Sequence, residues 1–161
     1  MTIEELRIDA MDLALLRQLQ QDATISNQAL AARVHTSPAT CLRRVKRLHD
    51  AGLIERQIAI LNPDKLAALT GHGLTAIVEV TLDRQNAEEL DRFEARVVQD
   101  GAVQQCYRVS PGPDFVLVVQ AAQMPDYQAL AQRLFNSDAN VRNVKAFFSV
   151  RRSKFGAAVP L

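Results

Sequence analysis

The chain has 161 residues, a formal net charge of +1 and 48% hydrophobic residues. This length allows one domain or two small ones, and the composition excludes a disordered chain. No apolar run is long enough to cross a bilayer, so we expect no membrane contact. The near-neutral charge excludes a uniformly basic protein, and a nucleic-acid function must therefore show itself in local charge patterning.

The cysteines and the first residues bear on the compartment. Cys41 and Cys106 are far apart and lack the spacing of metal ligands, so we interpret them as buried thiols in a reducing cytoplasm. Residues 1–8 are acidic and polar, which predicts no signal peptide. We expect a cytoplasmic protein that has no metal site.

The first part of the chain has the periodicity of helices. Asp9 suits an N-cap, with Asp12 in the first turn of a helix that runs to about Gln21. A second helix begins at Ser26 or Asn27 and presents a small apolar face. Almost no strand pattern appears before residue 55, so this part is predicted to be helical.

A third helix follows a short turn. Ser37 is its expected N-cap, Pro38 occupies the first helical position, and Gly52 ends it in the left-handed conformation. Residues 53–61 then alternate partly and predict a short strand or hairpin, the wing. Residues 1–61 are therefore expected to form a winged helix-turn-helix domain.

The charge of this domain is uneven. No acidic residue occurs between Asp22 and Asp50, whereas five cations do: Arg33, Arg43, Arg44, Lys46 and Arg47. A helix with one apolar stripe and a cationic remainder suits the phosphate-lined major groove of double-stranded DNA. An ordinary solvated face is the alternative, but such faces mix the two signs of charge. We therefore interpret the third helix as the recognition helix.

The expected apolar stripe of this helix is Leu42, Val45 and Leu48, which leaves Thr40 and the arginines projecting outward. The N-terminal part of a recognition helix enters the groove, so residues there are candidates for base edges and later ones for phosphates. The candidates for base edges are Ser37, Ala39, Thr40 and Arg43, beside Pro38. The candidates for phosphates are Arg33, Arg44, Lys46 and Arg47.

The second part of the chain has a different pattern. Residues 62–72 are expected to form a linker with a short helix, broken by Gly71 and Gly73. Beyond it, strands and helices alternate in the order βαββαβ, with strands near 74–82, 103–109, 114–120 and 141–150. We expect a ferredoxin-like domain at 73–161, with four antiparallel strands and two helices on one face. The fold class is therefore α+β.

Several segments resemble the leucine-responsive regulatory protein/AsnC family of transcription regulators. They are Asp9 and Asp12, residues 25–34, 37–48 and 52–54, and Leu61-Asn62-Pro63, together with the βαββαβ part. The resemblance implies an N-terminal DNA-binding domain and a C-terminal domain that oligomerises and binds an amino acid. It also implies dimers that often assemble into tetramers or octamers. No cofactor and no catalytic residue are implied.

The resemblance places the amino-acid effector between subunits. The corresponding positions here are Val109, Ser110, Gly112, Asp114, Met124, Phe147, Phe148 and Ser149. Asp114 would accept from the ammonium group, and Ser110 and Gly112 would donate to the carboxylate. Met124 and Phe148 would line a pocket for a compact apolar or aromatic side chain. Alternatively, Met124 and the phenylalanines are packing residues, and Asp114 caps its loop.

The family's turn between the second and third strands reads Thr/Ser-Gly-x-x-Asp. Here it reads Ser110-Pro111-Gly112-Pro113-Asp114, so proline replaces the first glycine and glycine comes one place later. Proline donates no N–H and fixes φ, which removes one backbone donor and stiffens the turn. The identity of the effector is therefore open.

Two other classes of function compete with a regulator. Sirohaem decarboxylases are similar to this family in both halves, but the chain has no histidine after His72 and hence few acid–base candidates there. An effector-binding protein without DNA contact is the third interpretation. The wholly cationic third helix favours the regulator over both.

Overall fold

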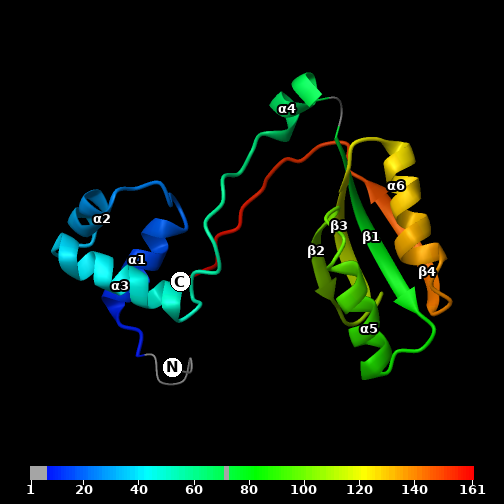
Figure 1. The fold of residues 1–161 in the computed structure, drawn as a ribbon, viewed down its shortest axis with the longest axis horizontal. Coiled ribbons are helices and arrows are strands. Elements are labelled where there is room, and N and C mark those ends of the chain that lie inside the picture. The colour runs from blue at the N-terminus through cyan, green and yellow to red at the C-terminus, as the bar shows by residue number, and fades with distance from the viewer. Residues whose placement is uncertain (1–6, 71–72) are drawn as a thin grey trace. The chain divides into compact units, whose positions relative to one another are not determined.

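The computed structural model describes residues 7–70 and 73–161, which form two compact units (Figure 1). The first unit holds residues 7–60 together with 154–161, and the second holds residues 61–153. The expectation about a signal peptide rests partly on residues 1–6, and the predicted helix break at Gly71 also lies outside the described residues. Residues 154–161, which the sequence groups with the second domain, make their contacts in the first unit.

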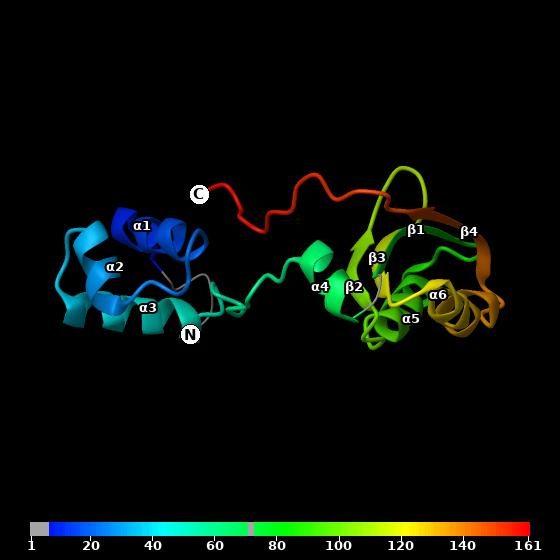
Figure 2. The ribbon, with the colours of Figure 1, turned by 90° about the horizontal axis from the view of Figure 1, so that it is seen from above.

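Three helices build the first unit: α1 (Ala10–Leu19), α2 (Asn27–Arg33) and α3 (Pro38–Asp50). Both ribbon views show the three helices gathered close together (Figure 1, Figure 2). They share one small core of fully or almost fully buried side chains, namely Leu15, Leu30, Ala31, Cys41 and Leu48. The apolar periodicity of the sequence thus gives three short helices that share one interior.

The predicted ends of these helices are confirmed. Asp9 and Asp12 form a reciprocal capping box on α1, and Ser26 and Ser37 are the N-caps of α2 and α3. Gly52 follows α3 with φ of +72°, a conformation that side chains with a Cβ rarely adopt. Short polar side chains therefore satisfy the free amides at the start of each helix.

The predicted wing is wrong for the single chain. Residues 55–62 contain no strand, and Ile58, Ile60 and Leu61 are exposed. An isolated two-stranded ribbon has too little apolar surface to cover, so partly alternating residues alone do not hold a hairpin together. The short helix after it is confirmed as α4 (Pro63–Thr70), where Asn62 Oδ1 accepts from the amide of Lys65.

The second unit confirms the predicted α+β fold. Its elements are β1 (Leu74–Leu82), α5 (Ala87–Val97), β2 (Val103–Arg108), β3 (Phe115–Ala121), α6 (Met124–Ala131) with the π-helical turn η2 (Gln132–Asn136), and β4 (Val141–Phe148). The sheet has the order β2-β3-β1-β4, and all three pairings are antiparallel. This is the ferredoxin-like arrangement of a split βαβ unit.

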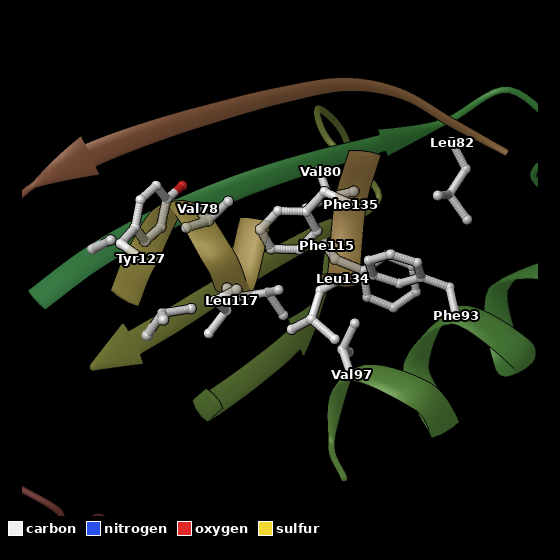
Figure 3. Packing of buried hydrophobic residues seen from close by; sticks show 13 residues of the cluster. Val78, Val80, Leu82, Phe93, Val97, Phe115, Leu117, Tyr127, Leu134 and Phe135 are labelled. Atoms are coloured by element: carbon white, nitrogen blue, oxygen red, sulfur yellow. The ribbon is translucent and has the colours of Figure 1, made fainter. Parts of the chain in front are cut away.

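The core of this unit lies between one face of the sheet and the two helices (Figure 3). Alternate residues of β1 and β3 are buried on that face, which is the period of two expected of strands. Phe93 of α5 stacks at a tilt on Phe115 of β3, with 4.8 Å between ring centroids. Tyr127 and Leu130 of α6 and Phe135 of η2 pack into the same core.

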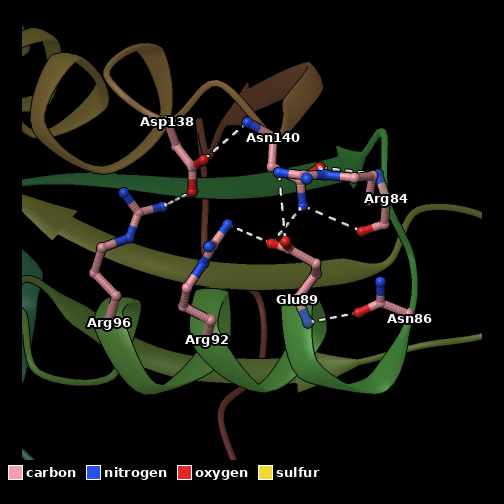
Figure 4. A network of polar contacts seen from close by, with 7 residues as sticks. All are labelled: Arg84, Asn86, Glu89, Arg92, Arg96, Asp138 and Asn140. Carbon is pink, nitrogen blue, oxygen red and sulfur yellow. Dashed lines mark hydrogen bonds and ion pairs between the residues drawn. The ribbon is translucent and has the colours of Figure 1, made fainter.

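A polar network ties the start of α5 to the loop before β4 (Figure 4). Asn140 is buried, accepts from the amide of Arg84 at 2.9 Å and donates to the carbonyl of Arg84 at 3.1 Å. Glu89 forms ion pairs with Arg84 and Arg92 beside it, and Arg96 pairs with Asp138. These bonds hold two loops in register, and we assign them a structural role.

The segment 154–161 lies along α1. Gln20 exchanges two hydrogen bonds with the backbone of Val159, at 3.0 and 3.1 Å, and Arg17 Nε donates to the carbonyl of Leu161 at 3.0 Å. The sequence of this segment has no strand or helix pattern. The segment makes these contacts with its backbone, so they do not depend on its side chains. The described residues contain no helix long and apolar enough to cross a membrane.

Candidate nucleic-acid interface and effector site

The inward face of α3 differs by one residue from the sequence prediction. Cys41 and Leu48 are fully buried and Val45 packs beside them, whereas Leu42 is 61% exposed. The prediction that Leu42 packs on α1 and α2 is therefore wrong. Residues seven apart return almost to the same side of a helix, so the stripe of Cys41, Val45 and Leu48 stays in line. Burial also raises the pKa of the Cys41 thiol above its ordinary value.

Arg44 and Arg47 turn toward α1 rather than outward. Arg44 Nη1 lies 2.8 Å from both Asp9 Oδ2 and Asp12 Oδ1, and Arg47 Nη2 pairs with Asp12 Oδ2. The predicted outward projection of these two arginines is wrong. A carboxylate that is fully buried, as Asp12 is, needs paired cations, and these side chains supply them.

This cluster is electrostatically self-contained. The Asp12 amide and the Arg44 guanidinium hold the pKa of the Asp9 carboxyl below its ordinary value of 3.8. The same contacts raise the pKa of Arg44, first through Asp9 and then through Asp12. We call Asp9, Asp12, Arg44 and Arg47 the α1–α3 ion cluster. Because its charges neutralise one another, it offers little to a phosphate.

The outward face of α3 carries two cations that remain available. Ala39, Leu42, Arg43 and Lys46 have the spacing i, i+3, i+4 and i+7, and all four are exposed. Within residues 7–70 and 73–161, neither Arg43 nor Lys46 has an ion pair or a side-chain hydrogen bond. We call these four residues the α3 outer face, and it is the surface that has charge free for a polyanion.

Three further residues that were predicted to bind DNA, Ser37, Pro38 and Thr40, lie at the N-terminus of α3. The Ser37 hydroxyl accepts from the Thr40 amide at 3.2 Å and donates to the Thr40 hydroxyl at 2.9 Å. Pro38 is exposed, and its carbonyl accepts from Asn27 Nδ2 at 2.8 Å. Ser37 therefore caps the helix, and its hydroxyl proton is already used in the hydrogen bond to Thr40. Asn27 fixes the turn between α2 and α3, a contact that the sequence pattern does not reveal.

Arg33 ends α2 and stands apart from the α3 outer face in sequence. Its Nη1 donates to Gln18 Oε1 at 3.1 Å, which is a neutral acceptor. Arg33 is exposed, as a phosphate contact requires.

The first group of predicted effector residues lies at the turn between β2 and β3. Val109, Ser110, Gly112 and Asp114 come together there, with the Val109 amide donating to the Asp114 carbonyl at 3.0 Å. The Ser110–Pro111 peptide is cis, and Gly112 has φ of +127°, a value open to glycine. Ser110 and Gly112 are exposed, so their donors face solvent. We call these four residues the turn group.

Asp114 has a structural partner. Its Oδ2 accepts from the Leu82 amide at 2.7 Å and from Gln85 Nε2 at 3.2 Å, which clasps the end of β1 to the start of β3. The loop-capping interpretation of Asp114 thus has direct support. A role toward an ammonium group is left to its other oxygen.

The second group lies at the opposite end of the sheet. Met124 starts α6 and is 41% exposed, while Phe148 pairs with Ala76 in β1 and meets Tyr127 edge to face at 5.0 Å. Ser149 donates its amide to the carbonyl of Thr75. We call Met124, Phe148 and Ser149 the far group.

Phe147 does not belong to the far group. Adjacent residues of a strand point to opposite faces, so Phe148 faces the helices whereas Phe147 faces the open side of the sheet beside Ile77. The two phenylalanines therefore lie on opposite faces of the sheet within one chain.

The two groups are separated along β1. Asp114 holds the amide of Leu82, and Phe148 pairs with Ala76, which is six residues earlier on the strand (82 − 76 = 6). At about 3.3 Å per residue this corresponds to roughly 20 Å. One chain therefore does not bring the turn group and the far group to the same small molecule.

Within residues 7–70 and 73–161, no group of three or more histidine, cysteine, aspartate or glutamate side chains is placed to hold a metal ion. The unpaired cations Arg43 and Lys46 of the α3 outer face suit a polyanionic ligand.

Two known sequence families match the two parts of the chain. Residues 8–49 match the AsnC-type helix-turn-helix domain, and residues 75–159 match the Lrp/AsnC ligand binding domain. The first match contains α1 to α3, and the second contains both the turn group and the far group. The α3 outer face thus lies in the helix-turn-helix domain, and the two groups of candidate effector residues lie in the ligand binding domain.

Whole-length relatives agree with this division. The chain is 34% identical to the DNA-binding transcriptional activator DecR of Escherichia coli over 96% of this chain and 99% of the relative. It is 33% identical to the leucine-responsive regulatory protein of Rhizobium meliloti over 99% of both chains. These named relatives are transcriptional regulators.

Solved structures show the same fold. An AsnC family transcriptional regulator from Agrobacterium tumefaciens aligns with a TM-score of 0.82 at 29% identity, over 95% of this chain and 97% of that one. A transcriptional regulator from Neisseria meningitidis, solved in complex with L-Met, aligns with a TM-score of 0.81 at 27% identity, over 96% and 97%.

Proposed function

This chain belongs to the Lrp/AsnC family of transcriptional regulators, and we propose that it reads DNA with the α3 outer face under the control of an amino acid. The observation that carries this proposal is the free charge of Arg43 and Lys46 on the exposed side of α3. In this proposal Ala39 and Arg43 meet base edges, and Lys46 and Arg33 meet phosphates. The start of α3, at Ser37, Pro38 and Thr40, directs its helix dipole toward the phosphate backbone.

The α1–α3 ion cluster has a different part in this proposal. Arg44 and Arg47 hold α3 at a fixed angle on α1 through the buried carboxylate of Asp12. They contribute rigidity to the reading surface, and the phosphate contacts pass to Arg33 and Lys46. A regulator of this kind acts where the chromosome is, so we place it in the cytoplasm.

Lys46→Ala tests the DNA proposal through the salt dependence of binding. Each cation that contacts a phosphate releases counterions, so its loss lowers the slope of log K against log salt by ~1 per contacting protomer. Binding to the duplex upstream of the protein's own gene is measured by fluorescence anisotropy between about 50 and 200 mM salt. Arg142→Ala, which removes one positive charge from β4, is the control and keeps the wild-type slope. A Lys46→Ala slope equal to that of Arg142→Ala would contradict the proposal.

We propose further that the effector sits between two copies of the chain. The turn group offers exposed donors for a carboxylate, the far group offers apolar surface, and roughly 20 Å separates them within one chain. A two-fold dimer brings the turn group of one copy to the far group of the other, because a symmetric interface exchanges the two ends. The effector class is an amino acid or a related metabolite.

The open side of the sheet supports such a dimer. Ile77, Tyr107 and Phe147 are all at least 43% exposed on or beside this face. Ile77 and Phe147 are paired across β1 and β4, and exposed apolar side chains that adjoin in this way mark a contact between protein molecules. Further assembly into tetramers or octamers is compatible with additional exposed apolar side chains in residues 58–61.

Mixing two inactive variants tests the shared site. Ser110→Ala removes a donor from the turn group, and Met124→Ala removes apolar surface from the far group, so each homodimer loses both sites. In a heterodimer, one site collects both substitutions and the other is intact. We expect amino-acid binding to return in an equal mixture to about a quarter of the wild-type occupancy, because half of the dimers are then heterodimers with one intact site each, and a thermal shift detects it. No recovery in a mixture that has exchanged subunits would contradict a site between copies.

No observation favours the decarboxylase interpretation over the regulator. The named relatives are regulators, and the described part of the second unit offers no histidine for acid–base chemistry. If the protein bound an effector but no DNA, the unpaired cations of the α3 outer face would have no ligand.

A further inference from the structure

Leu42 is the unexplained residue of the α3 outer face. It is a large apolar side chain that is 61% exposed, on a helix whose core contacts are made by Cys41, Val45 and Leu48. Scattered exposed leucines are common, so exposure alone decides nothing. What distinguishes Leu42 is its position next to the cations proposed to meet DNA.

The neighbours of Leu42 define an apolar strip with charged borders. Ala39 lies three residues before it and Lys46 four residues after it, which places all three on one side of the helix. Arg43 adjoins them on the same exposed surface. A polyanion that is held by Arg43 and Lys46 is therefore brought against two side chains without any hydrogen-bonding group.

The polar groups nearby have limited capacity for reading bases. The Ser37 hydroxyl spends its proton on Thr40, and the two hydroxyls bond to each other at the start of α3. Arg44 and Arg47 are held in the α1–α3 ion cluster. Apart from Arg43, the described side chains on this part of α3 read a base edge mainly by contact and shape.

The major groove has one apolar group at its base edges, which is the C5-methyl of thymine. We propose that Leu42, with Ala39 beside it, is a specificity-determining residue that selects thymine by contact with this methyl group. The inference rests on the proposed DNA binding by α3 and names the base that the apolar strip requires. Burying one methyl group corresponds to a discrimination of about four-fold in Kd.

Replacing thymine with deoxyuridine isolates this contact, because the two bases differ only by that methyl group. The duplex is the tightest binder selected from a random library by the full-length protein. Each thymine of one half-site is replaced in turn, and Kd is measured by anisotropy at fixed salt. We expect the wild type to lose about three- to five-fold at one or two thymines. Leu42→Ala loses that preference for thymine and keeps the wild-type salt slope.

Two further variants make the result specific. Leu42→Met retains apolar bulk and is expected to retain the preference for thymine. Leu69→Ala removes a leucine from α4 that is even more exposed than Leu42, and it is expected to behave as the wild type. Far-ultraviolet circular dichroism and thermal melting show that the Leu42 variants remain folded, as their exposure predicts.

The possible failures are distinguishable. If the wild type binds and Lys46→Ala lowers the salt slope, but no deoxyuridine position weakens binding, the thymine inference alone is wrong. If Leu42→Ala changes the oligomeric state and leaves the preference for thymine intact, Leu42 belongs to a protein interface and the inference is also wrong. If the wild type binds no duplex in a salt-dependent way, the DNA proposal fails together with this inference.

Discussion

Adjacent arginines on α3 have opposite roles. Arg43 is exposed and unpaired among the described residues, whereas Arg44 makes two ion pairs to the carboxylates of α1. The difference follows from helix geometry, since neighbours along a helix are rotated by about 100°. Removing the two side chains should therefore have different consequences, one for DNA binding and the other for stability.

Asp12→Asn should strongly destabilise the first unit. The substitution keeps the shape of the side chain but leaves Arg44 and Arg47 without their buried counter-charge. We expect a loss of roughly 3 kcal/mol in the free energy of unfolding, at the low end for buried ion pairs because both arginines are partly exposed. Urea unfolding measures it.

Asp50→Asn is the control, as it neutralises an exposed carboxylate at the end of α3. Its expected effect is within about 0.5 kcal/mol in either direction. Equal stability of the two variants would show that the α1–α3 ion cluster contributes little to the fold.

The residue types of this cluster were visible in the sequence, but their pairing was not. Asp9 and Asp12 are three residues apart, and so are Arg44 and Arg47. This spacing places the two members of each pair on the same face of the chain segment that carries them. Such spacing fits a DNA-binding face equally well. Only the crossing of α1 and α3, which depends on packing in three dimensions, decides between the two.

At the scale of the elements, α1 is fixed at its start by the capping box of Asp9 and Asp12. Hydrogen bonds and the nearby Arg44 depress the pKa of Asp9 below 3.8 in the folded chain. A depressed pKa means that the folded state favours the ionised carboxylate more than the unfolded chain does. The stabilisation by Asp9 is therefore complete above pH 3.8 and is lost as the pH falls below it.

Asp9→Asn should reveal this pH dependence. We expect the difference in melting temperature between wild type and variant to be constant above about pH 5 and to shrink steadily toward pH 3. Asp22→Asn does not serve as a control, since the pKa of Asp22 is also lowered, by Thr24. Asp50→Asn is suitable. A difference that grows on acidification would contradict the assigned role of Asp9.

The elements themselves were largely predictable. Caps at Asp9, Ser26, Ser37 and Asn86 gave the starts of four helices, because these side chains bond to nearby amides in any context. The strands followed from alternation of apolar residues. The wing prediction failed because a strand needs a partner, and residues 55–62 pair with no strand in the part of the chain that the structure describes.

At the scale of the whole molecule, the candidate effector site depends on assembly. The family resemblance assigned the residues of the turn group and of the far group to one effector site. In the fold of one chain the two groups lie apart along β1. Nothing in a local pattern reports a distance along a sheet. The open side of the sheet supplies the surface on which two copies would meet.

Phe147→Lys should shift the protein toward the monomer. The side chain is 52% exposed on the open side of the sheet, so the isolated chain tolerates a lysine while a symmetric interface would bring two like charges together. Sedimentation velocity measures the change in mass. Val150→Lys, at a fully exposed position beyond β4, is the control and should leave the assembly unchanged. A Phe147→Lys protein with the wild-type mass would exclude this face as the interface.

The central claim is that Arg43 and Lys46 carry the charge that meets DNA, while Arg44 and Arg47 serve the fold. The most direct measurement is the salt slope of duplex binding for the Arg43→Ala/Lys46→Ala double variant, at unchanged thermal stability. We predict a slope that is lower by ~1 per contacting protomer through the loss of Lys46, together with weaker binding at every salt concentration through the loss of Arg43. A wild-type slope in this folded double variant would contradict the account.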